Sequence, residues 1–171
     1  MLARFSVQRR HFSAASPTFP RLIGRYKTTP TVLYRIQSGA KVNLREKSKQ
    51  DALGRSSYDL VVHSGLVLPR PSAYFEGPNG MSLRPNGPMF QEVMRGFRGK
   101  NIYIYEIPKD LAVPEDLVIL HEHSDHYSFQ CDREMPLKEL NAKLTLFLDA
   151  HAKRMTKEQF MQANPGFHTG Q

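Results

Sequence analysis

The chain has 171 residues, of which 40% are hydrophobic and 23% charged, and this is the length and composition of one folded domain. Its single cysteine excludes an internal disulfide and any zinc site made of Cys-x-x-Cys pairs, and no apolar run is long enough for a membrane helix. The net charge of +8 is concentrated in residues 1–30, which hold six basic and no acidic residues. The other 18 basic residues nearly balance the 16 acidic ones, so no broad nucleic-acid surface is indicated.

The first thirty residues predict a targeting segment. The opening sequence "MLARFSVQRRHFSAASPTFP" is rich in Arg and Ser and lacks acidic residues, which is typical of a mitochondrial presequence. We therefore expect a presequence and linker in 1–30, a folded domain in 31–164 and a disordered tail in 165–171. The expected location is the mitochondrial matrix. If the segment is only a basic tail, the expected location is cytoplasmic.

The remaining chain predicts an α+β fold. The segment 63–88 is rich in Pro and Gly, which favours short strands and turns over long helices. The segment 101–107, "NIYIYEI", is largely apolar on both faces and predicts a central strand. The other expected strands cover residues 31–37, 58–62, 117–122 and 126–131, and the expected helices cover 89–97, a long segment beginning at Pro136, and 156–163.

A cluster of histidines between two of these strands raises the question of a metal. The spacing H-x-H-x-D-H, formed by His121, His123, Asp125 and His126, resembles the signature of metallo-β-lactamase-fold hydrolases. Only 45 residues follow it, and most of them predict helices, so the second half that such a dinuclear site requires is absent. A mononuclear metal hydrolase using these four residues remains an alternative. Solvated histidines in a turn are the favoured interpretation, and no metal is predicted.

Several segments appear in an order that points to another family. They are "LYRIQSG" (33–39), "GMS" (80–82), "IPKDLAVPEDLVI" (107–119) and "HYSF" (126–129), followed by Pro136 and a helix. From Thr31 to Lys153 this order resembles the ADP-ribosyltransferase-like toxin family typified by the NAD-dependent effector exported by bacterial type VI secretion, which has fungal relatives. The resemblance implies a split, mostly antiparallel β core with peripheral helices, a long C-terminal helix and NAD in the cleft between two small sheets.

The resemblance also implies site residues. Arg35 would place a guanidinium against the pyrophosphate or ribose of NAD, for which its fork shape suits it. Ser82 would support the nicotinamide ribose, His126 would bond the ribose, and Tyr127 would stack on nicotinamide. Ser82 and His126 are the expected catalytic residues, and all four are expected to bind NAD. Each residue also has a purely structural alternative. Arg35 would form an ion pair with Asp59, Ser82 would be a serine in a turn, and His126 and Tyr127 would be residues of an ordinary strand.

The implied activity is cleavage of the bond between nicotinamide and ribose, by an ADP-ribosyltransferase or an NAD glycohydrolase. The acceptor is not specified by the sequence, and a neutralising, immunity-like protein is an expected partner. Active transferases often carry a Q/E-x-E motif whose glutamate stabilises the ribose cation, and none stands near His126. This departure keeps open a second function, a catalytically inert module that binds a nucleotide or a protein.

Overall fold

The computed structural model describes residues 19–165. The predicted presequence up to residue 18 and the tail from residue 166 lie outside this range. The strands are β1 (Gly24–Tyr26), β2 (Leu33–Ser38), β3 (Leu66–Val67), β4 (Met81–Leu83), β5 (Ile102–Ile107), β6 (Leu117–His123), β7 (His126–Cys131), β8 (Met135–Pro136) and β9 (Lys153–Thr156). The helices are α1 (Lys47–Ala52), α2 (Pro88–Gly96), α3 (Leu137–His151) and α4 (Lys157–Ala163).

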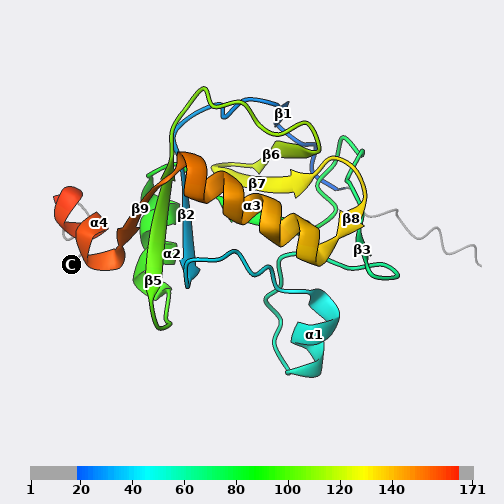
Figure 1. Cartoon of the computed structure of the whole chain (residues 1–171), viewed down its shortest axis with the longest axis horizontal. Helices are drawn as coiled ribbons and strands as arrows, with labels where there is room; N and C mark the ends of the chain where they lie inside the picture. The colour runs from blue at the N-terminus through cyan, green and yellow to red at the C-terminus, as the bar shows by residue number, and fades with distance from the viewer. Residues whose placement is uncertain (1–18, 166–171) are drawn as a thin grey trace, which may run out of the picture.

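The strands form two main sheets, which Figure 1 shows with different strand directions: β2, β5 and β9 run vertically at the left, and β6 and β7 run across the view beside them. One has four strands in the order β1-β6-β7-β4, and the other has three in the order β2-β5-β9. All pairs within them are antiparallel, and β3 and β8 form a small additional pair. The predicted α+β class with a split, mostly antiparallel core is therefore confirmed.

Alternation along β5 explains why the three-stranded sheet lies between two apolar clusters. Tyr105 and Ile107 face the larger core, whereas Ile104 faces a smaller one with Phe90 of α2 and Phe160 of α4. Successive side chains of a strand point to opposite faces, so a strand that is apolar on both must be covered twice. The predicted central position of 101–107 follows directly from this pattern, because β5 pairs with β2 on one side and β9 on the other.

The larger core lies between the sheets and α3, which crosses the face of β6 and β7 in Figure 1. Leu140, Leu144 and Leu148 are buried at helical spacing, and Phe147 meets Phe129 of β7 edge to face at 4.9 Å between ring centroids. These leucines recur every four residues, so α3 buries one face along its length. However, β9 and the short α4 follow α3, so the long helix does not end the described chain.

Three local features differ from the expectations. Residues 58–62 do not form the predicted strand, because Leu60 makes only an isolated parallel bridge to Glu46 while Asp59 turns its carboxylate to Arg45. The segment assigned to a linker contains β1, which pairs with β6. Residues 38–57, for which no helix or strand was predicted, contain α1. Within residues 19–165, no helix is long and apolar enough to cross a membrane.

A stability prediction concerns Gly80, a buried residue directly before the edge strand β4. A Cβ there would overlap the carbonyl oxygen of Phe129 and the side chain of Gln130. Gly80→Ala should therefore lower the free energy of unfolding, measured by urea denaturation, by about 1–3 kcal/mol. The matched control is Gly96→Ala at the end of α2, where a Cβ meets no atom within 4 Å and alanine should be neutral or stabilising. Equal effects of the two substitutions would contradict this account.

Candidate functional site

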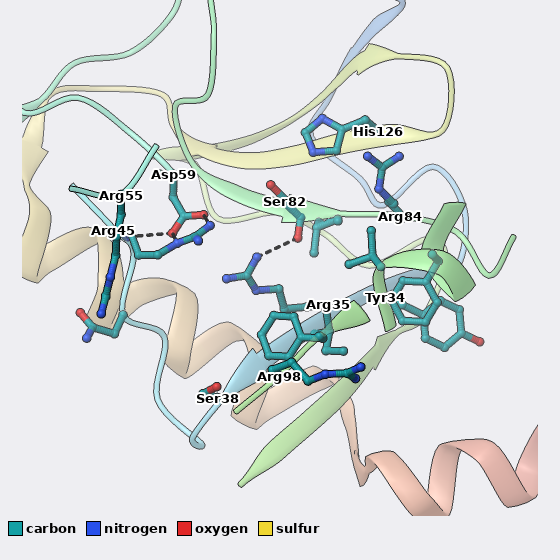
Figure 2. A pocket seen from close by; sticks show the side chains of 16 residues that line it. Tyr34, Arg35, Ser38, Arg45, Arg55, Asp59, Ser82, Arg84, Arg98 and His126 are labelled. Carbon is teal, nitrogen blue, oxygen red and sulfur yellow. Dashed lines mark hydrogen bonds and ion pairs between the residues drawn. The ribbon is translucent and has the colours of Figure 1, made fainter. Parts of the chain in front are cut away.

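The candidate site begins where the two main sheets touch. The backbone of Tyr34 in β2 pairs with that of Arg84 just after β4, through N–H···O hydrogen bonds of 2.7 Å and 3.1 Å. Among the described residues, no further backbone pairing between β2 and β4 follows this bridge, so the two strands separate beyond it. A pocket of about 570 Å³ lies between them, lined by side chains from both sheets and from α2 (Figure 2). Its volume is in the range of ligand-binding cavities.

The pocket is strongly cationic. Its lining includes one carboxylate, Asp59, and five arginines: Arg35, Arg45, Arg55, Arg84 and Arg98. Arg45 is paired with Asp59, and Arg84 is paired with Asp125. Within residues 19–165, the other three guanidinium groups have no carboxylate at ion-pair distance, so their charge is available to an anionic ligand.

Arg35 lines the pocket from β2 and bridges the gap between the two sheets. Its Nη1 donates a hydrogen bond to the carbonyl oxygen of Ser82, 3.2 Å away (Figure 2). Burial lowers the pKa of its guanidinium, and the charge of Asp59 opposes this shift. The group nevertheless stays protonated, as arginine does in proteins. The alternative role for Arg35, an ion pair with Asp59, is not what the structure shows, because Asp59 is paired with Arg45.

Asp59 holds the loop that forms one wall. Its two carboxylate oxygens accept hydrogen bonds from Nε and Nη2 of Arg45 at 2.9 Å and 2.8 Å, and Oδ2 also accepts from the Arg45 backbone N–H at 2.8 Å. Burial alone would raise the pKa of this carboxyl. The bonds from Arg45 and the charge of Arg35 outweigh burial and lower the pKa below its usual value. Asp59 is thus an ionised structural anchor whose oxygens are already engaged.

Ser82 and His126 enter the pocket from neighbouring strands. Ser82 lies in β4 opposite Ser128 of β7, and His126 is the first residue of β7. Both line the pocket with Arg35, so three of the four predicted site residues come together. In Figure 2 the His126 ring lies above the Ser82 side chain, with Arg35 on the opposite wall.

A buried carboxylate stands behind His126. Glu122 is 1% exposed, and its Oε2 lies 2.7 Å from Nδ1 of His126. Its Oε1 accepts hydrogen bonds from Oγ of Ser128 at 2.6 Å and from Nε2 of Gln130 at 3.0 Å. Because Nδ1 faces Glu122, the Nε2 edge of the His126 ring is the one left for a ligand.

The fourth predicted residue, Tyr127, is elsewhere. It follows His126 in β7, so its side chain points to the opposite face of the sheet. There it is buried in the larger core and stacks on His121 at 4.0 Å between ring centroids. Stacking on nicotinamide would require this ring to leave the core. The aromatic lining of the pocket is instead Tyr34, Phe90 and Phe97.

The histidine motif is split by the structure. Nε2 of His121 lies 2.6 Å from the carbonyl oxygen of Ser124, and Asp125 forms the ion pair with Arg84. Only His123 and His126 of the four motif residues approach each other, with ring centroids 5.1 Å apart. Burial, followed by the charge of His126, lowers the pKa of His123. The four-residue metal site considered from the sequence is therefore not assembled among the described residues.

Comparison with known families now identifies the chain. The model of the family described as Tse2 ADP-ribosyltransferase toxin matches residues 31–160, which is more than half of the chain. The chain belongs to this family. It is thus a toxin-like ADP-ribosyltransferase domain, as the order of its motifs predicted. Comparisons with curated proteins and with solved structures give no significant match.

Sequence reasoning missed much of what surrounds the three site residues in this Tse2-family domain. Arg45, Arg55, Arg84 and Arg98 are scattered along the chain, and no local pattern groups them. Glu122 belongs to no motif that the sequence suggested, so no local pattern assigns it a role. The sequence did contain a signal that excludes Tyr127 from the pocket. His126 and Tyr127 are consecutive residues of one strand, and such side chains point to opposite faces.

The Asp59–Arg45 pair predicts a pH-dependent contribution to stability. Asp59→Asn should lower the free energy of unfolding at pH 7 by roughly 2–3 kcal/mol, because a charge-assisted, buried pair is lost. The pKa of Asp59 is depressed in the folded state, so this contribution is full above the unfolded value near 3.8 and disappears as pH falls through the folded pKa. Urea denaturation of both proteins at pH 7 and below pH 3 measures the difference.

The control for this prediction is Asp51→Asn. Asp51 pairs with Lys47 on the exposed surface of α1, where an ion pair contributes little to stability. A difference in the free energy of unfolding between wild type and Asp59→Asn that is the same at pH 7 and below pH 3 would contradict the assignment of the pair as the source of the stability.

Proposed function

We propose that the pocket binds NAD and that the chain breaks the bond between nicotinamide and ribose, passing ADP-ribose to an acceptor. The observation that carries this proposal is the convergence of Arg35, Ser82 and His126, from three strands, on one cationic pocket of a chain in the Tse2 family. The reaction class comes from the family, and the assignment of residues comes from the pocket.

Charge and shape of the pocket support a dinucleotide. The pyrophosphate of NAD carries two negative charges, and Arg35, Arg55 and Arg98 offer guanidinium groups without carboxylate partners in residues 19–165. The wall from α2 supplies apolar surface for a ring, with Val93 38% exposed and Phe97 partly buried. Aromatic and cationic surfaces side by side suit a base and its phosphates.

In the proposed reaction, the C1′–N bond of the nicotinamide ribose breaks and its electron pair goes to the ring nitrogen of the departing nicotinamide. The ribose passes through a state with cationic, oxocarbenium-like character. An oxygen or nitrogen of the acceptor then attacks C1′ and releases its proton. Ser82 and the Nε2 edge of His126 hold the ribose in the required position, and such positioning alone lowers a barrier substantially.

The acceptor distinguishes two forms of this activity. If water attacks C1′, the products are ADP-ribose and nicotinamide, and the enzyme is an NAD glycohydrolase. If a nucleophile of another molecule attacks, the enzyme is a transferase in the strict sense. A toxin-like activity in the producing cell also calls for a neutralising, immunity-like protein that covers the pocket.

One observation favours the inert module as the second candidate function. Asp59 is the sole carboxylate among the pocket-lining residues, and both of its oxygens are engaged by Arg45. Related transferases use a free glutamate to stabilise the ribose cation. Among the described residues that line this pocket, none offers such a free carboxylate. A protein with this pocket and no turnover would bind NAD without consuming it.

The deciding experiment measures nicotinamide release from NAD by the full-length chain, followed by chromatography. Wild type should release nicotinamide, and Ser82→Ala and His126→Ala should each lower the rate by about 100-fold or more, because each loses a group that positions the ribose. The matched control is His121→Ala, which removes an imidazole from the neighbouring strand outside the pocket and should keep at least half of the rate. NAD binding without release in wild type would establish the inert module instead.

A second prediction tests the anion site without catalysis. Arg35→Gln should weaken binding of ADP-ribose, measured by calorimetry, by about 10- to 100-fold, since a charge-assisted hydrogen bond to phosphate contributes roughly 1.5–3 kcal/mol. The control is Arg133→Gln, because Arg133 pairs with Asp116 and Glu139 and does not line the pocket. Similar affinities for wild type and Arg35→Gln would remove Arg35 from the site.

A further inference from the structure

Three potential metal ligands meet at the end of the β6–β7 hairpin, beside the proposed NAD pocket. Glu122, His123 and His126 each offer a ligand atom, and these atoms lie within 4.8 Å of one another. The set of one carboxylate and two imidazoles is a common ligand set for zinc with an open coordination position. It shares only His123 and His126 with the four residues that the sequence motif suggested.

A β-bulge brings the ligands together. In a regular strand, Glu122 and His123 would point to opposite faces of the sheet. The register of β6 with β7 shifts between His121 and His123, so the extra residue Glu122 disrupts the alternation. Bulges re-aim side chains in this way and are common beside functional sites. The tight turn through Ser124, which has a φ of 40°, then returns the chain to His126.

Two polar atoms in this cluster are buried without a hydrogen-bond partner. Oε2 of Glu122 and Nδ1 of His126 lie 2.7 Å apart, but their alignment does not make a hydrogen bond, and no other described group bonds either atom. Glu122 is 1% exposed, and a buried carboxylate oxygen left without a hydrogen-bond partner destabilises the fold. A cation between these two atoms would satisfy both.

The other oxygen of Glu122 is held in place from behind. Ser128 and Gln130 both donate hydrogen bonds to Oε1, and Gln130 accepts one in turn from Asn79 at 3.2 Å. Such outer partners orient a metal-binding carboxylate and fix which oxygen it presents. His123 and His126 are only partly buried as residues, so the cluster lies close to the surface although two of its ligand atoms are buried.

We propose that Glu122, His123 and His126 bind one transition-metal dication of the zinc class. Ligand atoms of tetrahedral zinc are about 3.3 Å apart, since the metal–ligand bonds are about 2.0–2.1 Å. Oε2 of Glu122 and Nδ1 of His126 are 2.7 Å apart and all three ligand atoms lie within 4.8 Å of one another, so side-chain adjustment without backbone rearrangement completes the site. The ligand charges suit the ion, because one carboxylate and two neutral imidazoles leave a bound dication with a net charge of +1.

The site also regulates the proposed reaction, and this part of the inference rests on the proposed function. Without a metal, the Glu122 carboxylate 2.7 Å from Nδ1 favours the tautomer of His126 that has its proton on Nδ1, although the two atoms are not aligned as a hydrogen bond. In this tautomer Nε2 can accept a hydrogen bond from ribose. A metal on Nδ1 forces the proton to Nε2 and adds positive charge beside a ribose that is itself becoming cationic. Both changes oppose the transition state, so zinc acts as an inhibitor.

The test begins with binding. Calorimetric titration of ZnCl₂ into the tag-free, full-length chain should show one site per chain, and Co²⁺ should give the visible absorption of a tetrahedral complex. His123→Gln should weaken zinc binding by more than about 100-fold, because losing a ligand exceeds the 10- to 100-fold cost of losing an outer partner. The matched control, His121→Gln, alters the neighbouring histidine of the same strand and should bind zinc as wild type does.

Each outcome decides the binding claim. Absence of a zinc site in wild type, or equal affinity in wild type and His123→Gln, overturns it. Glu122→Gln is a second variant, expected to lose zinc, and its circular dichroism spectrum shows whether it still folds. If it does not fold, the comparison of His123→Gln with His121→Gln remains sufficient.

The activity arm separates this inference from the function on which it rests. The rate of nicotinamide release is compared between a sample with EDTA and a sample with saturating free zinc. For wild type the rate with zinc should be at least tenfold lower than the rate with EDTA. For His123→Gln the two rates should be equal at the same free zinc concentration. Zinc that binds without inhibiting overturns the regulatory role. No release even in EDTA contradicts the proposed function, while the calorimetry still decides the metal site.

Discussion

Two backbone hydrogen bonds between Tyr34 and Arg84 join the edges of the two main sheets, and the position of the pocket depends on them. They hold β2 and β4 together at one point only, so the strands separate beyond it and leave space that a continuous sheet would fill. The side chains of both residues support the joint. Tyr34 packs between Phe90 and Phe160, and Arg84 pairs with Asp125 at the hairpin turn. Movement of one sheet relative to the other would therefore disturb an apolar cluster and an ion pair together.

Behind the pocket, the β6–β7 hairpin contains a polar network where a core would ordinarily be apolar. Glu122, Ser128, Gln130 and Asn79 are all buried, and hydrogen bonds connect them in sequence. Such a network stabilises a fold only when its members are satisfied, and this one runs from Asn79 through Gln130 to Glu122, beside His126. Its unsatisfied end is at the pocket side. The unsatisfied atoms of Glu122 and His126 thus lower the stability of the hairpin. A ligand, a proton or a metal ion bound there can restore it.

The sequence predicted the parts of this molecule that depend on local pattern. The two-sided apolar alternation of β5 and the leucine spacing of α3 are properties of a few consecutive residues, and both appear in the fold. The bulge at Glu122 depends on the register between two strands, which no single segment specifies. The strand expected at 58–62 failed for a related reason, since Asp59 makes its strongest interaction with Arg45 rather than with a neighbouring strand. The arginines of the pocket converge only through tertiary structure.

The charge of the pocket bears on how such a site can promote formation of a ribose cation. Three guanidinium groups without carboxylate partners in residues 19–165 attract a dinucleotide but repel a positive ribose. Once NAD is bound, its pyrophosphate lies against these guanidinium groups, so the substrate itself neutralises the field that would oppose the reaction. The pocket of the free protein is then an incomplete electrostatic environment, and bound substrate completes it. A nucleoside without phosphates would therefore be a poor substrate even if its base packed against the aromatic wall. Its ribose would face the charge of Arg35 with no phosphate to neutralise that charge.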